Sequence, residues 1–270
     1  MHGHVARKRF GQNFLADPHY TARIVAAVDP QPGENIVEIG PGLAAITGGM
    51  IERAGHITAI EIDRDLAARL RERFAPAQLT LHEADALEFD FAALGTGLRV
   101  VGNLPYNISS PLLFHLAAFD ERLRDLHVML QREVVARMTA EPDTADYGRL
   151  TVMLQVKFAI RRLFVVPPGA FRPAPKVDSA IARLVPLGSA KPRIIDPALF
   201  ARVVAAAFGQ RRKTVRNALS AICDEAALRR MGIDPGARGE TLPVGEFVRM
   251  ANVLAHQVEE QSIDATGPDG

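Results

Sequence analysis

Short apolar runs alternate with longer amphipathic segments between residues 35 and 160 of the chain. The apolar runs predict buried strands, and segments such as 64–74 and 108–119 predict helices, because their apolar residues recur at helical spacing. This alternation is typical of a parallel sheet with crossover helices. The strands predicted for this sheet are 35–39, 57–62, 79–83, 98–102 and 125–131.

The pattern changes after residue 148. Residues 148–157 read as a helix, and 158–166 and 178–186 read as two further strands that pair at one sheet edge. The link 167–175 is rich in proline, which donates no backbone N–H, so we expect a shaped loop and no strand there. The fold class is therefore α/β, with a mostly parallel seven-stranded sheet.

A second domain follows a boundary near Gly188. Asp196 and Pro197 form a helix start, with a capping carboxylate followed by proline at the first helical position. An amphipathic pattern follows, whereas the end of the chain is acidic and has little to bury. The predicted parts are an α/β domain at 1–188, a small all-helical domain at 189–258 and a disordered acidic tail at 259–270.

Composition is that of an ordinary globular protein, with 48% hydrophobic and 23% charged residues. Cys223 is the only cysteine, so no internal disulfide can form, and a cytoplasmic protein is the simplest interpretation. The eight histidines are scattered without metal-ligand spacing, so no metal site is predicted. No apolar run approaches the length that spans a bilayer, so no membrane partner is predicted.

Charge is unevenly distributed although the net charge is only +1. Residues 1–13 carry +3 and residues 189–258 carry +5, while 14–188 carry −3 and 259–270 carry −4. The basic ends of the folded part favour a polyanionic partner, although a merely solvated charged surface would give the same pattern.

Small and acidic residues follow the first three predicted strands. Gly40, Gly42 and Ala45 form a G-x-G-x-x-A pattern, where the backbone can approach a ligand closely. Glu61 ends the second strand, where a carboxylate can accept the two hydroxyls of a ribose, and Asp85 follows the third. These strand ends meet at one sheet edge, so the sequence predicts an adenosine site there.

Two cofactors contain an adenosine that could be held in this way. A nicotinamide dinucleotide needs backbone N–H donors for its pyrophosphate, and Pro41 removes one of them. S-adenosylmethionine needs no pyrophosphate site, and its methyl group would point toward the end of the fourth strand. The sequence therefore favours methyl transfer.

The fourth strand ends in Asn103, Leu104, Pro105 and Tyr106. The Asn103 side-chain oxygen and the Leu104 carbonyl can each accept a hydrogen bond from an exocyclic amino group of a nucleobase. Pro105 keeps the preceding carbonyl out of the sheet ladder, and Tyr106 offers a ring on which a base can stack. Taken alone, these four residues also suit an ordinary strand-ending turn.

With these features assembled, the chain resembles the ribosomal RNA adenine dimethyltransferase family, most strongly its bacterial small-subunit branch. Six separated motifs in the same order carry the resemblance: 8–15, 38–43, 61–63, 103–111, 171–179 and 208–217. A macrolide-resistance branch, which methylates large-subunit RNA, shares the cofactor motifs. Ala44 departs from the glycine of many members, for which we expect at most a modest change in cofactor affinity.

The resemblance implies a Rossmann-like class I methyltransferase that uses S-adenosylmethionine, yields S-adenosylhomocysteine and dimethylates two adjacent adenosines in the 3′-terminal hairpin of small-subunit (16S) rRNA. Its implied partner is the small ribosomal subunit, and a monomer is expected. The cofactor-binding residues that it implies are Asn13, Leu15, Gly40, Gly42, Glu61, Ile62, Asp85, Ala86 and Asn103.

The target base must leave its RNA stack to reach the site. We expect Tyr106 to stack on one face and Phe171, presented by the proline-rich loop, on the other, with Asn103 and Leu104 holding the amino group. The predicted RNA-binding residues are basic: Arg7, Lys8, Arg9, Arg211, Arg212, Lys213 and Arg216. A non-enzymatic assembly factor and a DNA adenine methyltransferase remain the alternatives.

Overall fold

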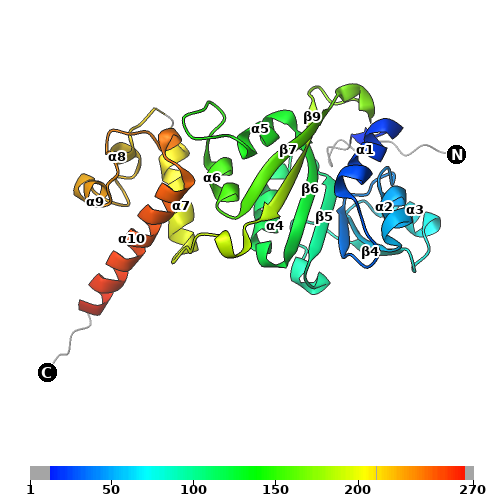
Figure 1. Cartoon of the computed structure of the whole chain (residues 1–270), viewed down its shortest axis with the longest axis horizontal. Helices are drawn as coiled ribbons and strands as arrows, with labels where there is room; N and C mark the ends of the chain where they lie inside the picture. The colour runs from blue at the N-terminus through cyan, green and yellow to red at the C-terminus, as the bar shows by residue number, and fades with distance from the viewer. Residues whose placement is uncertain (1–12, 211, 265–270) are drawn as a thin grey trace. The chain divides into compact units, whose positions relative to one another are not determined.

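The computed structural model describes residues 13–210 and 212–264, with side chains as far as Gln257. The chain forms two compact units (Figure 1). The first comprises the chain up to Ala136 together with Phe158–Gly188, and the second comprises Arg137–Lys157 together with the chain from Ser189 onward.

The first unit is built on a sheet of seven strands among the described residues. Their order across the sheet, with bounds, is β4 (Leu79–Glu83), β3 (Ile57–Glu61), β2 (Ile36–Ile39), β5 (Leu98–Asn103), β6 (Leu123–Gln131), β9 (Ser179–Pro186) and β7 (Phe158–Val166). The five strands from β4 to β6 are parallel, whereas β9 pairs antiparallel with both β6 and β7. The predicted mostly parallel seven-stranded α/β sheet is confirmed, with every strand end within two residues of its expected position.

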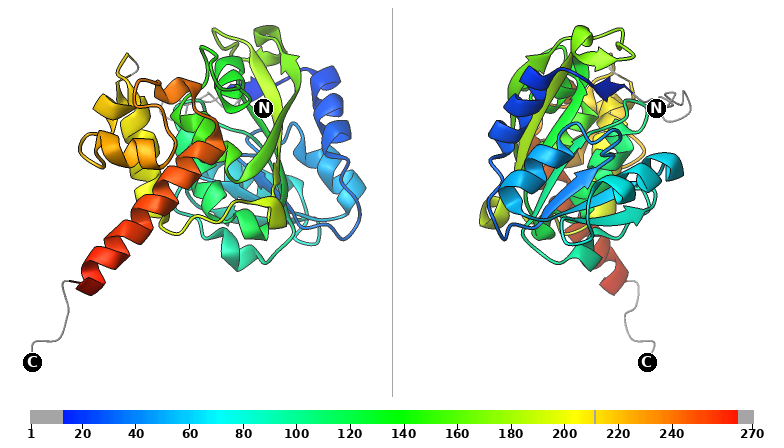
Figure 2. Two further views of the ribbon diagram at one scale, coloured as in Figure 1. Left: turned by 60° about the vertical axis from the view of Figure 1, so that its left-hand side comes forward. Right: turned by 90° about the vertical axis from the view of Figure 1, so that its right-hand side faces the viewer.

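Helices cover both faces of this sheet (Figure 2). On one face, α1 (Pro18–Val28), α2 (Thr47–Ala54) and α3 (Arg64–Arg73) share a buried apolar cluster with strand residues such as Val101 and Met129. Val100, which is adjacent to Val101 and therefore faces the other way, is also fully buried. There η2 (Phe91–Leu94) and α4 (Ser109–Ala118) pack together through the rings of Phe91 and His115, whose centroids are 5.7 Å apart.

A separate two-stranded sheet joins the start of the described chain to the proline-rich link. β1 (Phe14–Leu15) pairs antiparallel with β8 (Phe171–Arg172), with Leu15 opposite Phe171. The prediction that the link contains no strand is therefore wrong at residues 171 and 172. Neither residue is a proline, so both keep the backbone N–H that pairing requires.

A buried ion-pair network connects β5 and β6 at the end of the sheet where β5 begins. Arg99 is 5% exposed and contacts Asp125 through two hydrogen bonds, of 3.0 and 3.1 Å. Its guanidinium also donates to Glu34 at 2.6 Å and to the carbonyl of Val28, the last residue of α1, at 2.7 Å. The network thus fastens α1 and the loop before β2 to the central strands.

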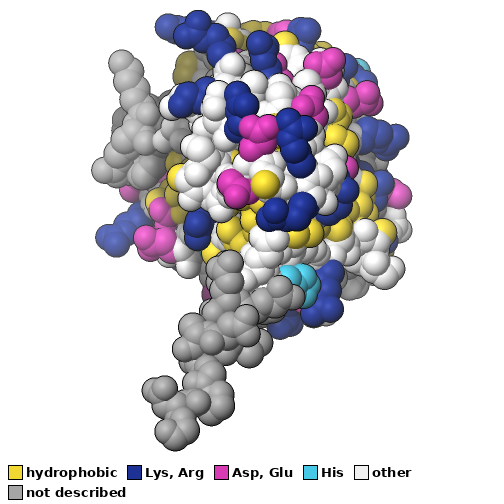
Figure 3. Space-filling view, turned by 90° about the vertical axis from the view of Figure 1, so that its left-hand side faces the viewer, with side chains coloured by type: hydrophobic (Ala, Val, Ile, Leu, Met, Phe, Trp, Pro, Cys, Tyr) yellow, Lys and Arg dark blue, Asp and Glu magenta, His cyan; other side chains and the backbone are white. Residues whose placement is uncertain are grey.

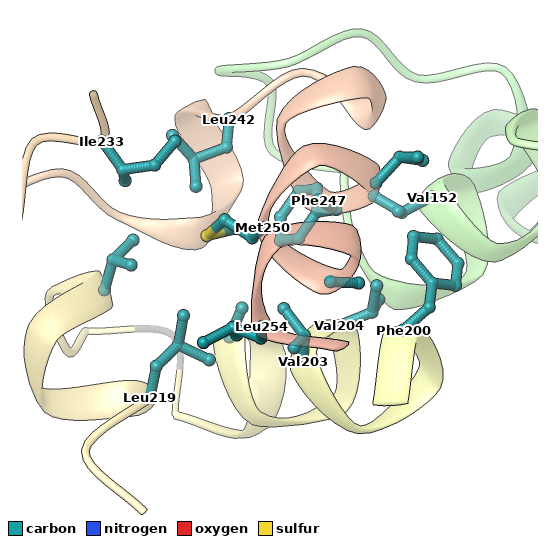
Figure 4. Packing of buried hydrophobic residues seen from close by; sticks show 14 of the residues in the cluster. Val152, Phe200, Val203, Val204, Leu219, Ile233, Leu242, Phe247, Met250 and Leu254 are labelled. Carbon is teal, nitrogen blue, oxygen red and sulfur yellow. The ribbon is translucent and has the colours of Figure 1, made fainter. Parts of the chain in front are cut away.

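The second unit is helical and has its own core. Its helices are α6 (Arg149–Gln155), α7 (Pro197–Gly209), α8 (Val215–Ala218), α9 (Glu225–Arg230) and α10 (Val244–Asp264). Figure 4 shows how α7 and α10 pack together, with Phe200 and Val203 from α7 facing the same apolar cluster as Phe247 and Met250 from α10.

Two features of this unit differ from the sequence expectation. α6 belongs to it although the residues are far from 189 in the sequence, because Val152 packs into the helical core. α10 continues to Asp264, whereas disorder is predicted for 259–270; residues 265–270 lie outside the part of the chain that the structure describes. The stretch 259–264 contains no glycine or proline, so nothing in the sequence ends the helix earlier.

The short helix α5 (Arg132–Met138) follows β6 directly. Nowhere in the described part of the chain is there a helix with the length and apolar character needed to cross a bilayer.

Candidate active site

A cavity of about 330 Å³ opens at the edge of the sheet where the parallel strands end. Residues just after β2, β3, β4 and β5 contribute to its wall, as expected for a ligand site in an open α/β sheet. All predicted cofactor-binding residues line it, and so do two of the other predicted catalytic residues: Asn13, Leu15, Gly40, Gly42, Glu61, Ile62, Asp85, Ala86, Asn103, Leu104 and Tyr106.

The turn after β2 brings main chain to the cavity wall. Gly40 and Gly42 have φ angles of 65° and 58°, in the left-handed region that glycine tolerates best. A Cβ on Gly42 would lie 3.1 Å from the ring of Phe14, so the aromatic ring packs directly against the turn. Ala44 also has a positive φ, of 62°, a conformation that glycine adopts more readily than alanine.

Glu61 links the ends of β2 and β3. Its two carboxylate oxygens accept hydrogen bonds from the backbone N–H of Gly42, at 3.1 Å, and of Asp63, at 2.9 Å. Burial raises the pKa of Glu61, while these hydrogen bonds act in the opposite direction. The carboxylate is held rigidly at the cavity, and its lone-pair sites, about four in a carboxylate, exceed the backbone donors that bind it, so it can accept from a further donor.

Glu38 is a site residue for which the sequence predicts no role. It lies on β2, is 2% exposed and lines the cavity. Burial, together with the nearby Glu61 carboxylate, raises the pKa of Glu38 to about 8. Its Oε2 has no hydrogen-bond partner among the described residues, and an unsatisfied buried acceptor at a cavity wall is typical of a ligand site. A glutamate inside an otherwise apolar strand was the available signal.

The far end of the cavity is formed after β3 and β4. Asp85 accepts the backbone N–H of Leu87 through Oδ1 at 2.9 Å, which fixes the carboxylate and leaves Oδ2 for another donor. Ile62 lines the same cavity with 44% of its surface exposed, whereas Ala86 is buried. An exposed isoleucine beside a fixed carboxylate suits a flat polar ring such as adenine.

Asn103 ends β5 with its side-chain amide fixed in one orientation. Nδ2 donates to the backbone carbonyl of Asn13 at 2.8 Å, so Oδ1 is the end of the amide that remains for a ligand. Just before Asn103, β5 lies very close to the end of β2. A Cβ on Gly102 would be only 2.7 Å from the Ile39 carbonyl oxygen, so this position has no room for a side chain. The main chain after Asn103 is also held, since the Leu104 N–H donates to Met129 at 3.1 Å.

Tyr106 is half-buried at the cavity wall, in the turn after Pro105. Its hydroxyl lies 2.6 Å from the Ser179 hydroxyl at the start of β9, a contact between distant segments that the local sequence pattern does not predict. Burial raises the pKa of the Tyr106 phenol, so the group is neutral.

Phe171 does not lie at the cavity, and its predicted exposure is wrong. Its side chain is fully buried in the core cluster that also contains Leu15, Ile24 and Ile181. The flanking prolines suggested an exposed loop, but the pairing of β8 with β1 turns this side chain into the core. Phe171 is therefore an ordinary core residue and not a surface on which a base can stack.

His127 lines the inner wall of the cavity from β6. It is 2% exposed, and burial lowers its pKa to about 4, so the imidazole is neutral at physiological pH. A single histidine inside an apolar strand gave no clue to this position.

The predicted RNA-binding residues are only partly covered by the structure. Arg7, Lys8, Arg9 and Arg211 lie outside the described residues. Arg212 and Lys213 are exposed, whereas Arg216 forms an ion pair with Glu225 at 3.0 Å. Glu225 also binds Arg229, at 2.7 Å. On the face shown in Figure 3, basic side chains lie interspersed with acidic ones.

Comparison with known proteins identifies one family. The family model described as ribosomal RNA adenine dimethylase matches residues 3–256. Among curated proteins, "Ribosomal RNA small subunit methyltransferase A" of Aromatoleum aromaticum is 62% identical over 255 residues, covering 94% of this chain and 96% of the relative. The protein of the same name from Thiobacillus denitrificans is 57% identical, covering 93% of this chain and 99% of the relative.

Two solved structures share the fold over most of the chain. A dimethyladenosine transferase from Plasmodium falciparum superposes with a TM-score of 0.77, covering 92% of this chain and 98% of that one at 21% identity. The 23S rRNA methyltransferase ErmE superposes with a TM-score of 0.67, covering 90% of this chain and 100% of that one at 28% identity.

Proposed function

The chain belongs to the ribosomal RNA adenine dimethylase family, and we propose that it dimethylates the exocyclic amino groups of two adjacent adenosines in the 3′-terminal hairpin of 16S rRNA. It uses S-adenosylmethionine and acts during maturation of the small ribosomal subunit, in the cytoplasm and as a monomer. The curated relatives named above, which this chain matches over nearly its full length, support the small-subunit substrate.

The cavity residues suit S-adenosylmethionine. The Glu61 carboxylate, fixed by two backbone N–H groups, accepts the ribose hydroxyls, and Asp85 Oδ2 accepts from the adenine amino group while Ile62 covers the ring. The unsatisfied Glu38 oxygen offers an acceptor for the ammonium end of the molecule. When bound, S-adenosylmethionine supplies an electrophilic methyl group, and S-adenosylhomocysteine is the product that remains.

Other cavity residues complete this binding surface. Gly40 and Gly42 allow the main chain to approach the ligand closely, and Ala86 leaves room beside the adenine. Asn13 and Leu15 contribute from the segment at β1, on the side of the cavity next to Asn103.

Asn103 and Leu104 activate the target nitrogen. The lone pair of an adenine amino group is delocalised into the ring, so the nitrogen is a poor nucleophile. When Asn103 Oδ1 and the Leu104 carbonyl accept its two hydrogens, a pyramidal and more nucleophilic nitrogen is favoured, and the positive charge that develops is stabilised. The methylated nitrogen is cationic and strongly acidic, so it loses its proton without a dedicated general base.

Tyr106 provides the stacking surface for the flipped base. A base stacked on an aromatic side chain gains about 1–3 kcal/mol, which is comparable with the cost of leaving the RNA stack. The phosphates of the rRNA are bound in part by Arg212 and Lys213, which are exposed on the helical unit. Arg7, Lys8, Arg9 and Arg211 are assigned the same role on charge alone.

The observation that carries this proposal is the orientation of Asn103, whose Nδ2 is occupied by Asn13 while Oδ1 remains for a ligand. The test incubates the protein with labelled S-adenosylmethionine and small subunits that lack these methyl groups, and then maps the label. We expect two adjacent adenosines near the 3′ end of the rRNA to gain two methyl groups each. Transfer to large-subunit rRNA or to duplex DNA instead would overturn the proposal.

A further inference from the structure

We propose that Ser179 is a positioning residue for methyl transfer, because its hydroxyl holds the Tyr106 ring in the orientation that receives the target base. This inference rests on the proposed function, since it concerns the same base-binding site. Ser179 does not line the cavity and acts only through Tyr106.

Tyr106 is anchored at both of its ends. Its backbone carbonyl accepts a hydrogen bond from Ser109 Oγ, at the start of α4, at 3.1 Å. Its phenol oxygen lies 2.6 Å from Ser179 Oγ. The rest of the residue belongs to a turn at the cavity wall, where the ring is only half-buried. The contact with Ser179 is therefore what restrains the far end of the ring.

Ser179 is a rigid reference point for this contact. It is fully buried, and it sits in the interior of the sheet at the first position of β9, opposite Gln131 on β6 and Val166 on β7. Because the backbone of Ser179 is fixed by pairing with both neighbouring strands, its hydroxyl holds the Tyr106 hydroxyl at a fixed position relative to the sheet. The catalytic amide of Asn103 ends β5, which pairs with β6 in the same sheet.

The hydrogen bond holds the end of the ring that lies farthest from Cα, and so it fixes the direction in which the ring points (χ1). The phenol oxygen lies on the axis about which the ring turns (χ2), so the plane of the ring is restrained only because hydrogen bonds to a phenol prefer to lie in that plane. A free ring would have to be ordered each time a base arrives, and ordering one mobile side chain slows the productive step about 3- to 10-fold. The hydroxyl itself is not needed for stacking, because phenylalanine offers the same aromatic face.

The test compares Tyr106→Phe, Ser179→Ala and the double variant under single-turnover conditions, with saturating undermethylated small subunits and S-adenosylmethionine. Each single change removes the same hydrogen bond from one side. We expect each to slow methyl transfer about 3- to 10-fold, and the double variant to be no slower than the slower single one. The affinity for S-adenosylmethionine and the KM for small subunits should change less than twofold.

Tyr147→Phe is the matched control. Its hydroxyl donates to the Leu242 carbonyl at 2.8 Å inside the helical unit, so the variant also loses a buried tyrosine hydrogen bond. It should lower the thermal midpoint without slowing transfer. Ser179→Ala could fail to fold, but Tyr106→Phe changes a half-buried turn residue and still tests the idea.

Wild-type rates in both single variants, or losses that multiply in the double variant, would overturn the role of Ser179. A wild-type protein that transfers no methyl group to small-subunit adenosines would instead overturn the proposed function, so the two failures are distinguishable.

Discussion

The Asn103 side chain donates through Nδ2 to the main-chain carbonyl of Asn13, 2.8 Å away and 90 residues earlier in the chain. The same early segment continues into β1, where Phe14 packs against Gly42 in the turn after β2. One short stretch of chain thus contacts the proposed methyl-donor site and also sets the orientation of the proposed catalytic amide. Because a backbone carbonyl accepts but never donates, it defines which end of the amide faces the cavity.

Replacing Asn103 with alanine should slow methyl transfer by a factor of about 10²–10³, because a group that stabilises developing charge is lost. The affinity for S-adenosylmethionine, measured by calorimetry, should fall only a few-fold. Asn35→Ala is the control, since Asn35 also donates from its amide to a carbonyl at 2.8 Å, that of Leu94, but does not line the cavity. Equal activity of the two variants would remove Asn103 from its role.

Glu38 should make the protein less stable as the pH rises. Its pKa is raised to about 8 in the folded state, so its contribution to stability is complete below the unfolded value of 4.5 and is lost progressively as the pH rises toward 8. Glu38→Gln removes this effect. We expect urea unfolding to show the variant about 2–4 kcal/mol more stable than the wild type at pH 8, and nearly equal to it at pH 5.

The Glu38→Gln variant should also bind S-adenosylmethionine more weakly at pH 8, because the amide cannot supply a negative charge. Because the Glu61 carboxylate is coupled to Glu38, the pH-dependent difference between the two proteins reports the titration of the Glu38–Glu61 pair. A constant stability difference across the pH range would show that Glu38 titrates normally.

The Arg99 network lies at the end of the sheet opposite the cavity, and it should make a large contribution to the free energy of unfolding. Arg99→Met removes the bidentate partner of buried Asp125, which keeps the contact with Arg183 at 3.0 Å, and breaking a buried pair in this way costs about 3–5 kcal/mol of unfolding free energy. The control is Arg71→Met, because Arg71 is half-exposed and its ion pair with Glu83, at 3.0 Å, is worth less than about 1 kcal/mol.

The contribution of the same network to stability should also be visible at low pH. Although burial acts in the opposite direction, hydrogen bonds from Arg99 hold the pKa values of Asp125 and Glu34 below their ordinary values of 3.8 and 4.5. Their contribution is therefore complete above those values and is lost as the pH falls through the lowered folded pKa values. Unfolding free energy measured below about pH 4.5 should fall less steeply in Arg99→Met than in the wild type, and an identical slope would argue against the network.

The residues of the site that could be predicted from sequence all sit at strand ends. Glu61, Asp85 and Asn103 each follow a local apolar run, and parallel strands bring such positions to one edge. Phe171 was misplaced because its environment depends on pairing with Leu15, a contact between distant segments that no local pattern records. For the same reason, the partner of Tyr106 was missed and α6 was assigned to the wrong unit.

The contribution of each basic residue of the helical unit to phosphate binding can be measured from the salt dependence of single-residue variants. The logarithm of the affinity for rRNA should fall linearly with the logarithm of the salt concentration, and removing one phosphate contact should reduce that slope by about 1. Lys213 is exposed, so Lys213→Ala should reduce the slope by about that amount. Arg216 is already shared with Glu225, so Arg216→Ala should have a smaller effect.

The informative result is which of the two variants reduces the salt slope more, because both remove one positive charge from neighbouring positions. A general effect of net charge would weaken binding equally in both. Filter-binding titrations between 50 and 200 mM salt, a range over which about 10³-fold losses occur when several phosphates are contacted, measure both slopes. A larger effect for Arg216→Ala would mean that RNA displaces Glu225, and the ion pair with Glu225 would then not weaken the RNA contact of Arg216.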